Sequence, residues 1–450
     1  MGEFTRRTFL KSAGLGAGAF LLTSKLVPKR GVAADQSRNF IFCYFSGGWD
    51  TLLCLDPRDP ATFTDDRSDE TRIQLGWDKI PAAFPRAILQ PSGSNIAFGP
   101  AVGPFAQHFD KSCVVRGISM DTVTHEVGRR YFITGKTPRG LTATGSSMPT
   151  RVVAQQGAHA PVPNLVARVE SYNEGLPPFA TGLSISSVTD LQLALTDGGQ
   201  APRDAARRRL DEYRAGFAAC DPALHDQKGM LSLILETQKG ARQLVSGGYD
   251  QRFRFTNTMD PEMMALRTRY AITNNLISSG AQAAMAFQAL KYGIAQSVSI
   301  ALAEGLDTHD SSWEDDHPNT LLAAFTALAQ LVTDLGAEPH PMGGSLLDRT
   351  TIVCFSEFGR TALINSRGGR DHSLCSSSLL IGAGVPHNKV IGASSDLGMN
   401  PMPVDPMTGA ALTAGGGVTI SPTLVLASIM KSAAMDTTEL RTDGLPCLIA

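Results

Sequence analysis

Short apolar runs alternate with longer helical patterns along the chain. Five runs predict buried strands: Asn39–Phe45, Cys113–Ile118, Ser297–Leu302, Thr350–Phe355 and Ser378–Ile381. Their hydrophobicity is continuous rather than alternating, which is typical of strands that are covered on both faces. The pattern therefore favours a parallel sheet with helices on both sides.

Amphipathic patterns between these runs predict helices. They lie at Arg203–Phe217, Leu231–Leu244, Glu262–Leu290 and Thr320–Leu335, and the third is long enough to hold two helices. Strands that alternate with helices predict an α/β fold with a doubly wound, mostly parallel sheet. Because no linker separates two cores, we expect residues 35–450 to form one domain.

Two stretches predict long loops. Asp56–Asn95 is rich in Pro, Asp and Ser, and Gly392–Gly417 is rich in Gly, Pro and Met. Long loops in compact domains are usually functional or disordered.

The N-terminus has the pattern of a removable export signal. Arg6-Arg7 is followed by an apolar, Gly/Ala-rich stretch and then by Val32-Ala33-Ala34, a small-residue cleavage site. The alternative is a membrane anchor, but the apolar run is shorter than the ~20 residues that a spanning helix needs. We predict a twin-arginine signal peptide over residues 1–34 and a periplasmic or secreted protein. It would meet the twin-arginine export machinery, and it would meet the membrane only during export.

Charge and cysteine content narrow the function classes. The chain has 40 basic and 42 acidic residues, and the first 34 residues hold six of the basic ones and one acid. The mature chain would therefore carry 34 basic against 41 acidic residues, a net charge of −7, so a nucleic-acid partner is not expected. The seven cysteines form no CxxC pair, which argues against a thiolate zinc site.

Charged side chains follow several predicted strands, where ligands bind in open α/β sheets. Asp50 follows the first strand across a Gly47-Gly48 turn, with a turn-capping role as the alternative. Asp307 and His309 follow the strand at Ser297–Leu302. In an extended segment, residues two apart point the same way, so both could reach one metal ion. Carboxylate and imidazole ligands suit zinc, manganese or iron.

Two further clusters add histidines and arginines. Glu357 and Arg360 follow the strand at Thr350–Phe355, and His372 comes about ten residues later. His125 and Arg129 follow the second strand. Arginine matches phosphate or sulfate oxygens in a bidentate manner. The alternative for Glu357 and Arg360 is a structural ion pair.

Four short segments, GGWDTL, LDTH, SEFGRT and GRDH, resemble the domain of unknown function 1501 family across essentially the whole mature chain. Its members are twin-arginine-exported proteins that are generally placed with the alkaline phosphatase/sulfatase superfamily. The resemblance implies an alkaline phosphatase-like fold with a two-metal site. It assigns Asp50 to the first metal position, Asp307 and His309 to a later Asp/His loop, and His372 to the last histidine. Glu357 falls where an Asp-His pair is expected.

The chain departs from that pattern at the nucleophile. Matching the sulfatase motif to Arg129 and Thr134-Gly135 places His125 at the nucleophile position, and an imidazole cannot act as an alkoxide.

The resulting hypothesis is an exported, metal-dependent hydrolase of a small-molecule or polymer-borne phosphate or sulfate ester. A divalent ion, zinc or manganese, would be bound by Asp50, Asp307, His309, Glu357 and His372. His125, Arg129 and Arg360 would serve catalysis, the arginines as clamps for the oxyanion. The alternative is a secreted binding or assembly protein that keeps the fold without catalysis.

Overall fold

The computed structural model describes residues 38–196, 209, 212, 247–413 and 415–450 of the 450-residue chain. The predicted signal peptide and the predicted helix at Leu231–Leu244 lie outside the described residues. So does the predicted helix at Arg203–Phe217, apart from Arg209 and Glu212.

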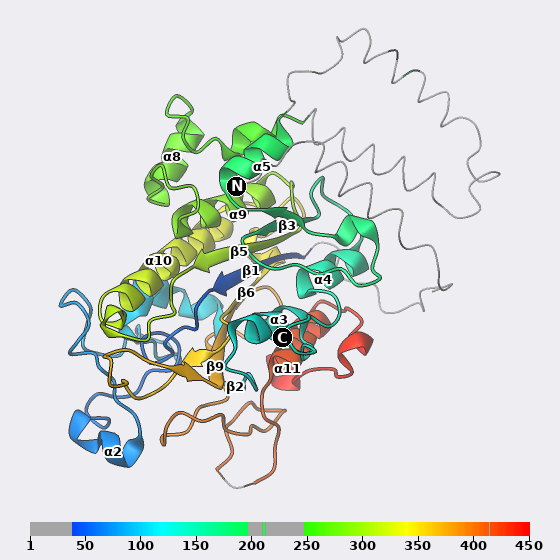
Figure 1. Cartoon of the computed structure of the whole chain (residues 1–450). Coiled ribbons are helices and arrows are strands. Elements are labelled where there is room, and N and C mark those ends of the chain that lie inside the picture. Colours follow the sequence, from blue (N-terminus) through cyan, green and yellow to red (C-terminus); the bar gives the residue numbers. More distant parts are fainter. Residues whose placement is uncertain (1–37, 197–208, 210–211, 213–246, 414) are drawn as a thin grey trace.

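One eight-stranded sheet organises the described part of the chain (Figure 1). Its order is β10-β2-β9-β6-β1-β5-β3-β4. Strand β9 is antiparallel to both of its neighbours, β2 and β6, and the other pairs are parallel. The strands are β1 (Asn39–Phe45), β2 (Ser112–Ser119), β3 (Asn164–Ala167), β4 (Leu183–Ile185), β5 (Ser297–Ala303), β6 (Thr350–Phe355), β9 (Cys375–Gly382) and β10 (Lys389–Ile391). The predicted α/β fold with a mostly parallel sheet is confirmed.

Strand β1 shows why the sheet lies between two layers of helices. Its side chains alternate between two hydrophobic clusters, with Ile41, Cys43 and Phe45 in one and Phe40, Phe42 and Tyr44 in the other. Helices α9 (Ser279–Lys291) and α10 (Asp316–Ala337) contribute to the first cluster. Helices α3 (His125–Thr134), α4 (Met148–Gln156) and α11 (Pro422–Ser432) contribute to the second. Figure 1 shows these two groups on opposite sides of the sheet.

The helical pattern at Glu262–Leu290 forms two helices, α8 (Pro261–Arg269) and α9. The Asp260 carboxylate caps α8 by accepting hydrogen bonds from the N–H groups of Glu262 and Met263, and Pro261 takes the first helical position. The pattern at Thr320–Leu335 lies within α10. Among the described residues, the helical segment Ser311–Ala337 is long and apolar enough to cross a membrane, but half of its most apolar window is buried inside the fold.

The two predicted loops contain little regular structure. Asp56–Asn95 holds only a 3₁₀ turn at Asp65–Arg67 and the single-turn helix α2 (Ser68–Thr71). The described residues of Gly392–Gly417 hold no helix or strand. The pattern did not indicate α5 (Val188–Leu195) or a small hairpin of β7 (Gly359–Arg360) and β8 (His372–Ser373). One domain over residues 35–450 stays a prediction.

Candidate metal centre

The loops that follow three adjacent parallel strands, β6, β1 and β5, lie at the same edge of the sheet and form one site. The turn after β1 passes directly beneath the loop after β5. Gly47 has a φ of 113°, and a Cβ atom there would lie 2.6 Å from the backbone nitrogen of Asp307. A side chain at Gly47 would therefore force these two loops apart.

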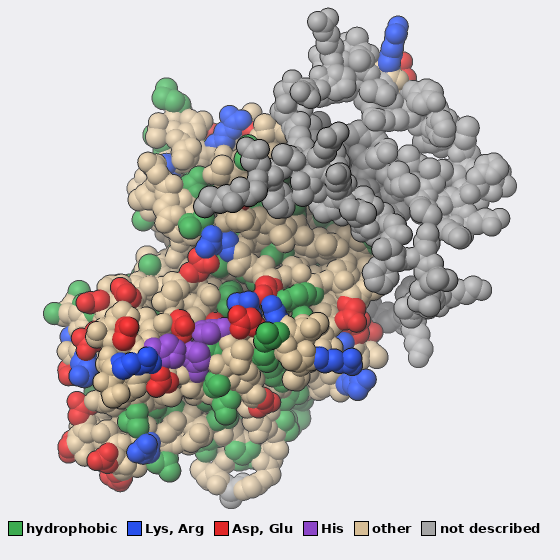
Figure 2. Space-filling view, viewed as in Figure 1, with side chains coloured by type: hydrophobic (Ala, Val, Ile, Leu, Met, Phe, Trp, Pro, Cys, Tyr) green, Lys and Arg blue, Asp and Glu red, His purple; other side chains and the backbone are tan. Residues whose placement is uncertain are grey.

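Histidines reach the site from two further segments. His125 is the first residue of α3, which follows β2. His372 lies on β8 and is paired with Arg360 of β7 in an antiparallel register. Figure 2 shows histidine side chains gathered on one face of the molecule, among acidic and basic side chains.

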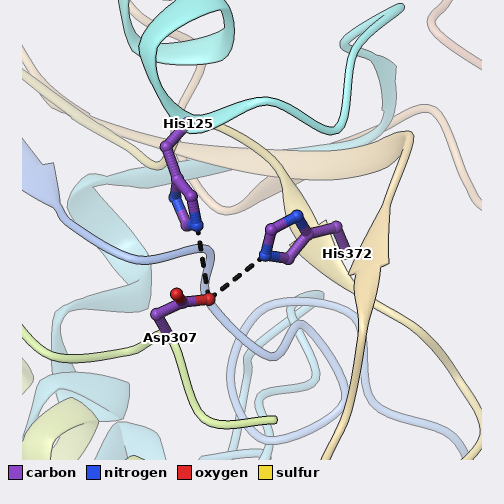
Figure 3. A group of neighbouring side chains, drawn as sticks. All are labelled: His125, Asp307 and His372. Carbon is purple, nitrogen blue, oxygen red and sulfur yellow. Dashed lines mark hydrogen bonds and ion pairs between the residues drawn. The ribbon is translucent and has the colours of Figure 1, made fainter.

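The carboxylate of Asp307 is the centre of the group (Figure 3). Its Oδ1 lies 3.3 Å from Nε2 of His125 and 3.1 Å from Nε2 of His372. Nε2 of His309 lies 3.0 Å from the same oxygen and 3.0 Å from Nε2 of His372. The ligand atoms of His125, Asp307 and His372 all lie within 4.8 Å of one another.

Hydrogen bonds at Nδ1 determine the tautomer of the imidazoles of His125, His309 and His372. Nδ1 of His125 lies 2.8 Å from Glu357 Oε1, Nδ1 of His309 lies 2.8 Å from Asp371 Oδ1, and Nδ1 of His372 lies 2.7 Å from the carbonyl oxygen of Val123. Because carboxylates and carbonyls only accept hydrogen bonds, each Nδ1 carries the proton. In the neutral rings the lone pairs of Nε2 therefore face Asp307.

This arrangement fits a divalent metal ion. Ligand imidazoles usually donate the other ring N–H to a carboxylate or a carbonyl, as these three do. Nε2 of His125 is buried and makes no hydrogen bond. Zinc ligands at about 2.1 Å in a tetrahedron lie about 3.4 Å apart, close to the spacings around Asp307.

The pKa values of the group favour a charged carboxylate. Burial raises the pKa of Asp307, but the hydrogen bond and the positive charge of Arg360 outweigh it and hold this pKa well below its usual range. The hydrogen bond to Glu357 raises the pKa of His125, whereas burial lowers the pKa of His372. Asp307 is thus an anion that faces polarised imidazoles.

Glu357 lies behind His125 and not at the centre. Its carboxylate is 1% exposed, and it accepts the N–H of Gly47 at 2.9 Å and lies 2.9 Å from the hydroxyl of Ser356. Burial raises its pKa, but the hydrogen bond from His125, together with backbone hydrogen bonds that include that of Gly47, brings the pKa below its ordinary value. The sequence predicts Glu357 as a metal ligand; in the structure its carboxylate contacts Nδ1 of His125, on the opposite side of the ring from Asp307, and orients that ring.

The two predicted catalytic arginines have different surroundings. Nη2 of Arg360 lies 2.5 Å from Asp307 Oδ1, and Nη1 lies 3.3 Å from Nε2 of His309. The guanidinium of Arg129 instead binds Glu170, with Nη2 2.8 Å from Oε1. The structure thus brings Arg360 into the group, and it engages Arg129 elsewhere.

Asp50 also lies apart from the imidazoles. Its carboxylate is 1% exposed and accepts hydrogen bonds from Trp313 Nε1 at 3.0 Å and from the N–H of Leu52 at 3.0 Å. Nε of Arg370 lies 2.8 Å from its Oδ2. The expectation that Asp50 binds a metal together with His309 and His372 does not match this geometry, because an internal ion pair occupies the carboxylate.

Two contributors to the site were given no role from the sequence. Asp371 orients His309, and the carbonyl of Val123 orients His372. Asp371 stands next to His372 in the sequence, so its acidic side chain was a visible signal. A backbone carbonyl leaves no signal in a residue pattern.

Three solved structures are similar to the chain over most of its length. One is a protein in the alkaline phosphatase superfamily from Vibrio parahaemolyticus, with 10% identity, a TM-score of 0.34, and coverage of 88% of this chain and 73% of that one. The lipoteichoic acid synthase LtaP from Listeria monocytogenes has 7% identity, a TM-score of 0.38, and coverage of 97% and 81%. Ps i-CgsB, solved in complex with k-i-k-neocarrahexaose, has 10% identity, a TM-score of 0.37, and coverage of 91% and 75%.

No curated protein matches the sequence. A protein family does match it, over residues 37–416, which include every residue of the metal centre. The chain belongs to this family, which is described as "Protein of unknown function (DUF1501)".

Proposed function

We propose that this protein is an exported, metal-dependent hydrolase of a phosphate or sulfate ester. The observation that carries the proposal is the meeting of three imidazole Nε2 atoms at one carboxylate oxygen, Oδ1 of Asp307. Lone pairs that face an anion repel one another unless a cation or a proton lies between them.

The ligands would be His125, Asp307 and His372, with His309 beside them as a fourth donor. When bound, a zinc or manganese ion supplies Lewis acidity toward an ester oxygen and lowers the pKa of a water molecule. Glu357 and Asp371 hold two of the imidazoles in the tautomer that binding requires.

Arg360 would attract the negatively charged group of the substrate. Its side chain is fully buried, and its Nε donates to the carbonyl of Gly48 at 3.0 Å while Nη1 donates to the carbonyl of Arg370 at 3.0 Å. These bonds fix the guanidinium beside Asp307. A fixed positive charge next to the ligands favours an anionic substrate, as a phosphate or sulfate ester is.

One observation favours the alternative of a secreted binding or assembly protein. The resemblance gives His125 the place of the nucleophile, and its ring is already engaged with Glu357 and Asp307. In a binding or assembly protein, the metal ion would stabilise the fold and would not take part in catalysis.

The deciding experiment uses the purified mature chain. Metal content is measured by mass spectrometry, and turnover is measured with aryl phosphates, an aryl phosphodiester and aryl sulfates, before and after chelation and metal return. We expect metal-dependent hydrolysis of at least one ester class, which His372→Ala abolishes and His340→Ala retains. A metal-loaded protein that turns over none of these esters would favour the binding protein. A protein that takes up no transition metal would overturn the metal site.

Export is tested separately. Replacement of Arg6 and Arg7 by lysine should retain the protein in the cytoplasm, as cell fractionation would show. Secretion of this variant at the level of the natural sequence would overturn the proposed route.

A further inference from the structure

Asp50 and Arg370 form an ion pair that is closed to solvent. Asp50 is 1% exposed and Arg370 is 0% exposed. Nη1 of Arg370 donates to the carbonyls of Thr361 and Ala362 at 2.9 and 2.7 Å, and Nη2 donates to those of Gln74 and Leu75 at 2.6 and 2.9 Å. The guanidinium carbon also lies 4.7 Å from the centre of the Trp313 ring. Arg370 could not move away without leaving several buried carbonyls unpaired.

Both oxygens of the Asp50 carboxylate have partners. Arg370 binds Oδ2 together with Trp313, and the N–H of Leu52 binds Oδ1. A metal ion at Asp50 would have to displace a buried guanidinium or lie directly against it. Both arrangements leave an uncompensated positive charge in the interior, which is strongly unfavourable. Asp307 also contacts a buried guanidinium, that of Arg360, but its side chain is 48% exposed, so solvent can screen an ion there.

The charges around the site balance with one divalent ion. Two buried guanidinium groups and four carboxylates lie in and around the site: Arg360 pairs with Asp307, Arg370 pairs with Asp50, and Glu357 and Asp371 contact His125 and His309. This leaves two negative charges. Arg367 also lies 3.5 Å from Asp371; the two side chains are 62% and 50% exposed, so solvent weakens both of their contributions, and omitting this pair leaves one negative charge. On either count, one divalent cation brings the group closer to neutrality than two do.

We infer that the site takes a single metal ion, at His125, Asp307 and His372, and that the Arg370 guanidinium occupies the place beside Asp50 that a second ion would need. The inference rests on the proposed metal site and departs from the two-metal arrangement that the sequence resemblance implies. Arg360 then provides the second positive charge beside Asp307, as a fixed group of the chain.

The test counts bound ions. The mature protein is freed of metal with a chelator, saturated with Mn²⁺ and separated from excess by gel filtration. Manganese per protein is then measured by mass spectrometry, and the electron paramagnetic resonance spectrum is recorded. The same measurements are made with Zn²⁺ in place of Mn²⁺ for stoichiometry alone. His372→Ala serves as the variant that loses a ligand, and His340→Ala is its matched control.

We expect one equivalent of metal and the spectrum of isolated Mn²⁺ ions, with binding lost in His372→Ala and kept in His340→Ala. Two equivalents with an exchange-coupled spectrum would overturn the single-ion inference and leave the proposed metal site intact. Uptake below a tenth of an equivalent with either metal would overturn both.

Discussion

Nδ1 of His125 lies 2.8 Å from Oε1 of Glu357, and Nε2 of the same ring points at Asp307. The buried carboxylate of Glu357 therefore orients the His125 ring, whose opposite nitrogen lies next to the central residue, Asp307. The two residues are 232 positions apart in the sequence and are joined only by the approach of α3 to the end of β6.

Glu357→Gln should weaken metal binding without removing a ligand. The amide lacks the negative charge that holds the proton on Nδ1 of His125. Nε2 of the same ring therefore becomes a weaker metal ligand. Removal of such an outer partner costs roughly 10–100-fold in metal affinity. Competition with a chromophoric chelator would measure the change.

Glu126→Gln is the matched control, because Glu126 follows His125 in α3 and its side chain is 44% exposed. Its affinity should stay at the wild-type value. An unchanged affinity in Glu357→Gln would show that the Glu357 contact does not orient His125.

Gly128→Ala should disturb the contact between His125 and Glu357 by displacing the backbone of helix α3. A Cβ atom on Gly128 would lie 2.3 Å from the carbonyl oxygen of Glu357 and 3.1 Å from its Cβ atom. Helix α3 would have to move away from Glu357, and the bond to His125 would lengthen. Alanine favours a helix over glycine by roughly 0.5–1 kcal/mol. We nevertheless expect metal affinity to fall by at least about tenfold, as for loss of the Glu357 contact.

Gly336→Ala tests the same exchange in a helix with open space. A Cβ atom there would meet only the side chain of Leu347, at 3.8 Å. This variant should bind metal as the wild type does and unfold at an equal or higher urea concentration. Equal metal affinities in the two variants would contradict the steric argument.

Asp50→Asn should destabilise the fold more than it changes the metal site. The amide leaves the buried Arg370 without its counter-charge, and breaking a buried ion pair from one side costs about 3–5 kcal/mol. Urea unfolding of the metal-free protein measures this loss. Asp396→Asn, which removes a 78% exposed partner of Arg58, should cost under about 1 kcal/mol. If Asp50→Asn were as stable as Asp396→Asn, the ion pair would not stabilise the fold.

The strands were the most predictable part of the fold. β1 and β6 match their predicted bounds because both of their faces are buried, so every position after Asn39 of β1 and every position of β6 is apolar, aromatic or small. β3 and β4 hold four and three residues, which is too short for a pattern to stand out from its surroundings. Helix α3 was not among the predicted helices, since it has only ten residues and its two arginines pair with Glu170 in a partly buried position.

The types of residue in the site were predictable from the sequence. Which of them lies at the centre and which lies behind another residue was not. Asp50, Asp307 and Glu357 each follow a buried strand, and nothing in their local sequence separates them. One of them pairs with an arginine 320 positions away, one faces the imidazoles and one lies behind His125. These roles depend on long-range packing, which a local pattern does not contain.

Glu170 should make the stability of the protein depend on acid pH. Its carboxylate binds Arg129 Nη2 at 2.8 Å and Arg130 Nε at 3.0 Å, and it also accepts from the hydroxyl of Tyr172. Burial raises its pKa, but these hydrogen bonds, led by that of Arg130, bring the pKa below its ordinary value. Because the folded pKa is depressed, the stabilisation is present above the unfolded pKa of about 4.3 and is lost as the pH falls through the folded value.

Glu170→Gln should therefore lower the free energy of unfolding by roughly 1–3 kcal/mol at pH 7, since it weakens hydrogen bonds to charged groups. The difference from the wild type should shrink as the pH falls below about 4, because protonation then removes the same charge from the wild-type carboxyl. Urea unfolding at a series of pH values measures both variants. Glu70→Gln, at an exposed pair with Arg67, should differ by less than about 1 kcal/mol throughout. A Glu170→Gln deficit that stays constant down to the acid limit of folding would rule out ionisation of Glu170 as its cause.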